Sequence, residues 1–125
     1  MVSLNTYYLI FVLFFRFSPI TANNRLLFQE LYSVFTKKYR WGFLDGYKDE
    51  HLGQFGFAFS LLLLHKYGRT ERSVDFYAEK YFKAFPVLLE NSTESPRFCI
   101  SAYALRTFEN FLEFFGLVEL SPKNY

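Results

Sequence analysis

The chain is poor in cysteine, proline and glycine and carries little net charge, and each shortage excludes a class of protein. Its 125 residues include one Cys, so no intramolecular disulfide can form and a disulfide-stapled fold is excluded. Four Pro and six Gly are too few for a collagen-like or proline-rich sequence. A net charge of +2 is too small to demand a nucleic acid or an anionic surface as partner.

Aromatic side chains are abundant instead, because 18 Phe, 10 Tyr and 1 Trp make up 23% of the chain. A chain of this length typically forms one domain, which we place at residues 1–125. The aromatic supply can fill a core and still leave aromatic surface over, and such surface usually marks an interface. A drift of the composition toward Phe and Tyr is the alternative explanation. The single Cys99, in an apolar setting, indicates an inert buried thiol and a reducing, cytoplasmic location.

Apolar residues at helical spacing predict four principal helices, at 23–40, 49–67, 71–85 and 102–115. The run from Phe55 to Leu64 is apolar on every face, which predicts a central helix buried on all sides. Gly68, Pro86 and Gly116 are expected to end the last three helices. The expected fold is therefore mainly α: a compact bundle of four principal helices around a buried central helix, with a minor C-terminal β element at Leu117–Leu120.

The connections are predicted from turn-forming residues, which collect at 41–48 and 90–96. Gly42 is expected to end the first helix, Thr70 to cap the third and Ser101 to cap the last. Between the loop at 90–96 and the last helix lies the short apolar stretch Phe98–Ile100, which could pair as a strand with the C-terminal β element.

The N-terminal segment 1–18 contains nine consecutive apolar or aromatic residues, from Tyr7 to Phe15. A membrane-spanning helix needs about 20 such residues, so this run is too short to span a bilayer. We expect it to pack on the domain as a helix or strand. A signal peptide, an interfacial membrane anchor over Tyr7–Phe17, or an over-long translated start are the alternatives.

The stretch from Ser101 to Glu119, SAYALRTFENFLEFFGLVE, resembles the recognition helix and first wing strand of winged helix-turn-helix proteins. In that family an amphipathic helix ends in a hydrophobic residue, followed by Gly, two aliphatic residues and a charged residue. Residues 115–119, FGLVE, match this order, and Gly116 permits the left-handed cap. The resemblance implies that helices 49–67 and 71–85 are the two that precede a recognition helix.

The same resemblance implies a set of nucleic-acid contacts, because the exposed face of a recognition helix enters the major groove. Glu109 and Glu113 on this helix would repel phosphates, which argues against the assignment. The implied base-reading candidates are Tyr103, Arg106, Thr107 and Asn110, and the implied phosphate contacts are Arg97 and Lys123.

Motifs for catalysis, phosphate loops and metals are missing from the sequence. Asp45, Asp49, Glu50 and His51 form the densest group of potential metal ligands, and we interpret them as acids at a helix start beside a solvated His. We therefore expect no enzyme activity, no metal and no cofactor. The cations at Lys37, Lys38 and Arg40 are interpreted as complementing the dipole of a helix end, and a phosphate-binding patch is the alternative.

Two functional hypotheses follow from these patterns. The first is a small helical protein–protein interaction or structural module without catalytic activity, which binds a protein partner or itself through exposed aromatic surface. The alternative is a winged-helix-like nucleic-acid-binding protein of the transcriptional regulator type. Membrane contact through Tyr7–Phe17 is a third, less favoured expectation.

Overall fold

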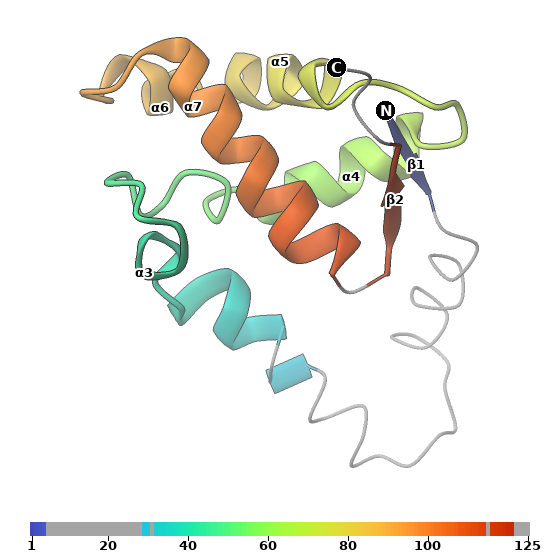
Figure 1. Cartoon of the computed structure of the whole chain (residues 1–125), viewed down its shortest axis with the longest axis horizontal. Coiled ribbons are helices and arrows are strands. Elements are labelled where there is room, and N and C mark those ends of the chain that lie inside the picture. Colours follow the sequence, from blue (N-terminus) through green and yellow to red (C-terminus); the bar gives the residue numbers. More distant parts are fainter. Residues whose placement is uncertain (5–28, 31, 115, 122–125) are drawn as a thin grey trace.

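The fold is mainly helical with one small two-stranded sheet, as expected (Figure 1). The computed structural model describes residues 1–4, 29–30, 32–114 and 116–121. In chain order the elements are β1 (Val2–Leu4), the π-helix η1 (Val34–Lys38), α3 (Trp41–Asp45), α4 (Phe57–Tyr67), α5 (Val74–Ala84), α6 (Val87–Glu90), α7 (Pro96–Tyr103), the π-helix η2 (Ala104–Glu113) and β2 (Val118–Leu120).

The longest helical element runs diagonally across the molecule and consists of α7 continued directly by η2 (Figure 1). It begins at Ser95, whose hydroxyl accepts a hydrogen bond from the Phe98 amide at 3.2 Å, with Pro96 in the first turn. The predicted start at Ser101 is therefore wrong, because a better cap lies six residues earlier. Residues 98–100 are helical, so they cannot pair as a strand with the C-terminal β element.

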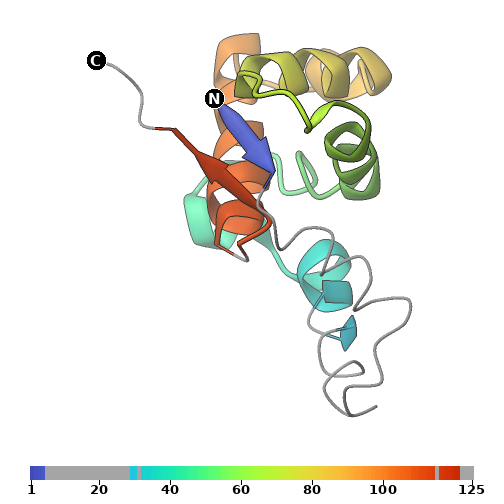
Figure 2. The same cartoon turned by 90° about the vertical axis from the view of Figure 1, so that its right-hand side faces the viewer.

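The C-terminal strand β2 takes its partner from the other end of the chain. It pairs antiparallel with β1, with Val2 opposite Leu120 and Leu4 opposite Val118 (Figure 2). Val2 also exchanges two backbone hydrogen bonds with Arg72, ahead of α5, and its side chain is fully buried. Val2 thereby becomes part of the core.

α4 packs against α5, and α5 also packs against α7 and η2. The helix predicted at 49–67 is observed only over Phe57–Tyr67, because residues 50–56 form turns that contain Gly53 and Gly56 at positive φ (83° and 67°). Gly68 caps α4 as predicted. The prediction that this segment is buried on all sides is wrong: Leu62 is 60% exposed, and Ala58 is exposed one turn before it.

α5 begins and ends at local signals. Its cap is Ser73, whose hydroxyl accepts from the Phe76 amide at 3.2 Å, rather than Thr70. Pro86 follows the end of α5 and starts the single turn of α6, as its fixed φ and missing amide predict.

The N-terminal half departs most from the expectation. Residues 29, 30, 32 and 33 are helical and lead into η1, which ends before Tyr39, so Gly42 does not end this helix but lies inside α3. The apolar run Tyr7–Phe15, the whole of the possible anchor segment Tyr7–Phe17 and residues 23–28 lie outside the described residues. Across the part of the chain that the structure describes, no helix is long and apolar enough to cross a membrane.

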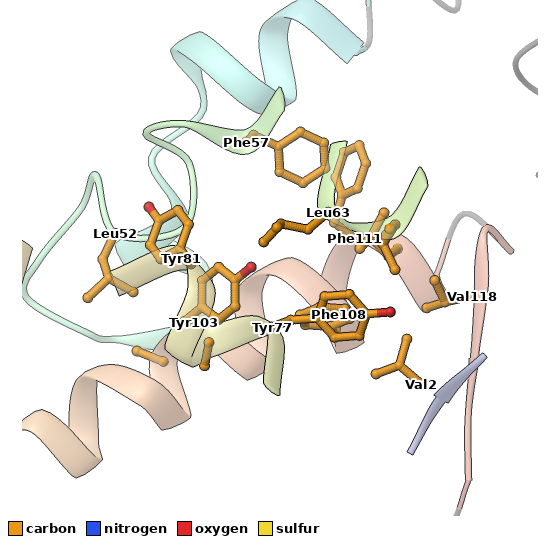
Figure 3. Close-up of a cluster of buried hydrophobic side chains, with 14 of the residues drawn as sticks. Val2, Leu52, Phe57, Leu63, Tyr77, Tyr81, Tyr103, Phe108, Phe111 and Val118 are labelled. Atoms are coloured by element: carbon orange, nitrogen blue, oxygen red, sulfur yellow. The ribbon is translucent and has the colours of Figure 1, made fainter. Parts of the chain in front are cut away.

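The core is built largely from aromatic rings, and it extends from Leu52 at one end to Val2 and Val118 at the other (Figure 3). Tyr81 of α5 stacks on Tyr103 of α7, with ring centroids 4.3 Å apart. Phe57 and Phe111 meet edge to face at 4.5 Å. Much of the aromatic content of the chain therefore serves the core, as the large apolar area of these rings favours.

Candidate functional site

The structure turns most of the predicted recognition surface inward. Tyr103 and Thr107 are fully buried, and Arg106 is 1% exposed. The Tyr103 hydroxyl lies 2.8 Å from the Ser60 hydroxyl of α4, and burial raises its pKa. The prediction that these three side chains lie on the exposed face of the last helix is wrong, because that face packs against α4, α5 and the 45–53 segment.

The other predicted contacts are dispersed. Arg97 is exposed in the first turn of α7, and Asn110 is half-buried in η2. Thirteen residues along one helical element separate them by up to roughly 20 Å. Lys123 lies outside the described residues. The structure therefore brings together Tyr103, Arg106 and Thr107 inside the core and leaves Arg97 apart from them.

Arg106 instead forms the centre of a buried polar cluster that organises the loop before α4. Its Nε donates to Asp45 Oδ2 at 2.6 Å and its Nη2 donates to Asp45 Oδ1 at 2.9 Å, a bidentate pair. The three remaining donors reach backbone carbonyls, at Tyr47 (3.2 Å), at Leu52 (3.1 Å) and at Asp49. All five guanidinium N–H groups are thus used, as burial of such a charge requires.

This cluster fixes the start of the 45–53 segment to the long helix. The Asp45 side chain is only 2% exposed, and it belongs to the last turn of α3. The acid that seemed a potential metal ligand is therefore the counter-ion of Arg106. Among the described residues, no group of three or more His, Cys, Asp or Glu side chains is placed to hold a metal.

The short helix α3 projects two apolar side chains into solvent. Phe43 is 87% exposed and Leu44 is 57% exposed. The helix itself is held at both ends: Trp41 is buried and its Nε1 donates to the Phe35 carbonyl at 2.7 Å, and Asp45 is held by Arg106. α3 therefore cannot rotate to bury Phe43 and Leu44 without breaking the buried contacts of Trp41 and Asp45.

A second feature is an open hollow of about 560 Å³ beside the end of η1. Its lining is predominantly apolar, and its walls come from the 32–37 helix and from the segment that enters α4. The lining residues are Tyr32, Thr36, Lys37, His51, Gln54, Phe55, Gly56, Phe57 and Ala58. Another hollow, of about 390 Å³, lies between residues 48–52 and residues 87–91 and has a more polar lining.

Cys99 has the environment expected of a structural thiol. It is 2% exposed, and its Sγ lies 3.3 Å from the Ser92 hydroxyl. Ser92 donates in turn to Asp49 Oδ2 at 2.6 Å, which ties the 91–95 loop to the 45–53 segment. The contacts of Cys99 and Ser92 therefore serve to hold the 91–95 loop in place.

Comparisons of the chain with protein-family models, with curated proteins and with solved structures find no match.

Sequence reasoning missed the exposed pair on α3, because residues 41–48 were interpreted as a loop. The signal that was available is the tetrapeptide from Trp41 to Leu44, in which the three residues other than Gly42 are large and apolar. A loop rarely carries so many large apolar side chains without burying some of them.

Proposed function

We propose that the chain is a helical interaction module without catalytic activity, which assembles with a second copy of itself through the apolar side chains of α3. The observation that carries the proposal is Phe43, which is 87% exposed on a helix whose two ends are anchored in the core. A Phe side chain left in water forgoes roughly 2–3 kcal/mol of burial free energy, which an interface would recover.

The anchoring of α3 makes this surface suited to binding. Because the backbone that carries Phe43 is already fixed, association has to order only the side chain itself, so more of the burial free energy appears as affinity. Trp41 and Asp45 provide that hold from opposite ends of the helix. Aromatic side chains are enriched at the cores of protein interfaces.

Three considerations support a second copy of the chain as the partner. The same chain carries a projecting ring at Phe43 and an apolar hollow of about 560 Å³. The net charge of +2 opposes self-association only weakly. Closed two-fold dimers are the commonest oligomers of soluble chains, and they use one surface patch on both copies.

Sedimentation of the full chain over a range of concentrations tests the proposal. We expect a monomer–dimer equilibrium that Phe43→Glu weakens at least tenfold, since about 1.4 kcal/mol corresponds to a factor of ten and the ring contributes more than that. Ala58→Glu, which places a charge at the rim of the hollow, should weaken it in the same way. Leu62→Glu is the matched control, because Leu62 is also exposed but lies outside both features.

Three outcomes would overturn this reasoning. They are a chain that stays monomeric at the highest concentrations, a Phe43→Glu variant that associates like the parent, and a Leu62→Glu control that loses association equally. The circular dichroism spectrum of each variant should match that of the parent, because both Phe43 and Leu62 point into solvent.

The winged-helix-like nucleic-acid-binding proposal has less support. Of its described candidates, Arg97 and Asn110 reach solvent at least in part, and the other three are core residues. Membrane contact through Tyr7–Phe17 and a cytoplasmic location stay predictions.

A further inference from the structure

A group of cations surrounds two aromatic rings where α4 ends and α5 begins, away from α3. Lys66 Nζ lies 5.2 Å from the centre of the Tyr67 ring, and the Arg72 guanidinium lies 4.5 Å from that of Phe76. Lys80 Nζ lies about equally far from both ring centres, 5.7 Å from that of Tyr67 and 5.6 Å from that of Phe76. The rings meet edge to face at 5.2 Å. We call this surface, with the exposed Arg69 of the connection, the basic–aromatic face.

No ion pair within the described part of the chain joins a cation of this face to a carboxylate. The ion pairs found there join Arg40 to Glu50 and Arg106 to Asp45, both elsewhere. No hydrogen bond from the Arg72 side chain is found to any described residue, and its Nε is a buried donor without a partner.

Three acids lie near the basic–aromatic face and limit its positive charge. Glu71 accepts a hydrogen bond from the Ser121 hydroxyl at 2.9 Å. Asp75 and Glu79, four residues apart, follow an adjacent strip of α5 and are exposed. The face therefore attracts polyanions only weakly through long-range charge, and the rings must add to the affinity.

The backbone of the face is held rigidly. Arg72 exchanges two backbone hydrogen bonds with Val2, at 2.5 Å and 3.2 Å. Ser73 then caps α5 one residue later, which fixes the direction of the helix that carries Phe76 and Lys80. α4 and α5 lie side by side, so Tyr67 stays next to Phe76 (Figure 1).

We propose that the basic–aromatic face binds single-stranded nucleic acid. Such a strand offers phosphates to the four cations and base planes to the two half-buried rings, and this combination is how sequence-tolerant single-strand binders work. A guanidinium that lies on a ring also presents its own outer plane, on which bases stack. The site is independent of α3, so the proposal goes beyond self-association.

The salt dependence of binding follows from the number of cations. Four phosphate contacts to a single strand give a slope of about −2.8 in log affinity against log salt, so affinity should fall roughly 50-fold between about 50 and 200 mM salt. The probes are fluorescent oligo-dT and oligo-U of about 15 nucleotides, followed by anisotropy with the full chain. Absence of binding to both at the lower salt would overturn the proposal.

The double variant Lys66→Gln/Lys80→Gln tests the location of the site. Each lost phosphate contact should weaken binding roughly tenfold at about 50 mM salt, so we expect a loss of about 10- to 100-fold. The matched control is Lys37→Gln/Lys38→Gln, which removes the same charge from exposed positions on η1. Equal losses in the two double variants would mean that net charge alone drives binding, and would overturn the assignment to this face.

The role of the rings is tested by a ligand without bases. Because stacking contributes about 1–3 kcal/mol per base, the strand should bind at least about fivefold tighter than polyphosphate of similar charge. Phe76→Leu should reduce that preference and leave polyphosphate binding unchanged. Tyr67→Leu serves the same purpose if Phe76→Leu does not fold. Equal affinity for strand and polyphosphate, or tighter binding to duplex DNA or to phosphatidylserine vesicles, would refute the proposal.

Discussion

Replacing Arg106 with methionine should destabilise this protein more than any exposed substitution. Methionine keeps much of the volume of the side chain but removes all five donors. It leaves the Asp45 carboxylate, which is 2% exposed, without its counter-ion and with only the Tyr47 amide as a donor, at 2.9 Å. The carbonyls of Tyr47, Asp49 and Leu52 lose the donor that Arg106 supplies. Breaking a buried ion pair on one side costs about 3–5 kcal/mol, a large part of the roughly 5–15 kcal/mol that stabilises a domain.

The expected change in melting temperature follows from the length of the chain. With about 2.1 cal/mol/K of unfolding entropy per residue, 125 residues give a drop of about 15 °C for a loss of 4 kcal/mol. Thermal unfolding followed by circular dichroism measures it directly. Hydrogen exchange adds the location: the amides of residues 45–53 should lose protection before those of α5, because the cluster holds that segment.

A matched control exists in the same region of the chain. Arg40 pairs with Glu50, but the Arg40 side chain is 75% exposed and solvent screens the pair, so Arg40→Met should change the stability far less than Arg106→Met does. The double variant Asp45→Leu/Arg106→Met also removes the buried carboxylate that would have no counter-ion, and it should be more stable than Arg106→Met alone. The reasoning is refuted if Arg106→Met lowers the melting temperature no more than Arg40→Met does.

Three further predictions concern backbone and tyrosine groups. Gly56→Ala should lower the free energy of unfolding, measured in urea, by about 2–4 kcal/mol, because φ is 67° and the new Cβ would lie 2.6 Å from the Phe85 ring. Gly46→Ala, also at positive φ but in open space, should cost only about 1 kcal/mol, and equal losses in the two variants would contradict this. Tyr81→Phe should cost about 1–3 kcal/mol, since the hydroxyl accepts from the Gly53 amide at 3.1 Å and donates to a carbonyl at 2.6 Å, and a change below about 0.5 kcal/mol would argue against that role. Burial raises the pKa of Tyr81 to about 12, so the folded state holds this proton more tightly than the unfolded state does. The free energy of unfolding should therefore be highest below about pH 10 and fall by roughly 2–3 kcal/mol as the pH rises toward 12. Unfolding free energies that stay level over that range would disprove this.

The parts of the fold that the sequence predicted are those set by local signals. Pro86 cannot continue a helix, and Gly68 follows α4 as its cap, so both helix ends were predicted from single residues. The alternation of apolar and charged residues along α5 likewise matches its buried face, which includes Tyr77 and Tyr81. Each of these signals acts over a few residues, so no knowledge of the tertiary contacts is needed.

The parts that could not be predicted depend on contacts between distant residues. From the sequence alone Arg106 is expected on an exposed helix face, and only its contact with Asp45, 61 residues earlier, explains why it is buried. The turns before α4 look helical by pattern, but Gly53 is held by the Tyr81 hydroxyl, 28 residues later. These tertiary interactions override local propensity, and one sequence does not reveal them.

The candidate site was missed for a related reason. Its exposed pair, Phe43 and Leu44, depends on which side chains of the short helix turn inward. Trp41 turns inward because the carbonyl of Phe35 accepts its indole N–H. The sequence marked this stretch only as rich in glycine, and glycine favours a turn as readily as the end of a short helix.

The pairing of β1 with β2 has a consequence for the order in which the molecule folds. Val2 and Leu120 are among the most distant residues in the sequence that touch, so their pairing has to close nearly the whole chain into a loop. That closure becomes entropically cheaper once the helices between them have formed, since folded structure shortens the free chain. The strand pair should therefore form after the rate-limiting barrier. Substitutions at Val2 should then accelerate unfolding and leave the folding rate almost unchanged.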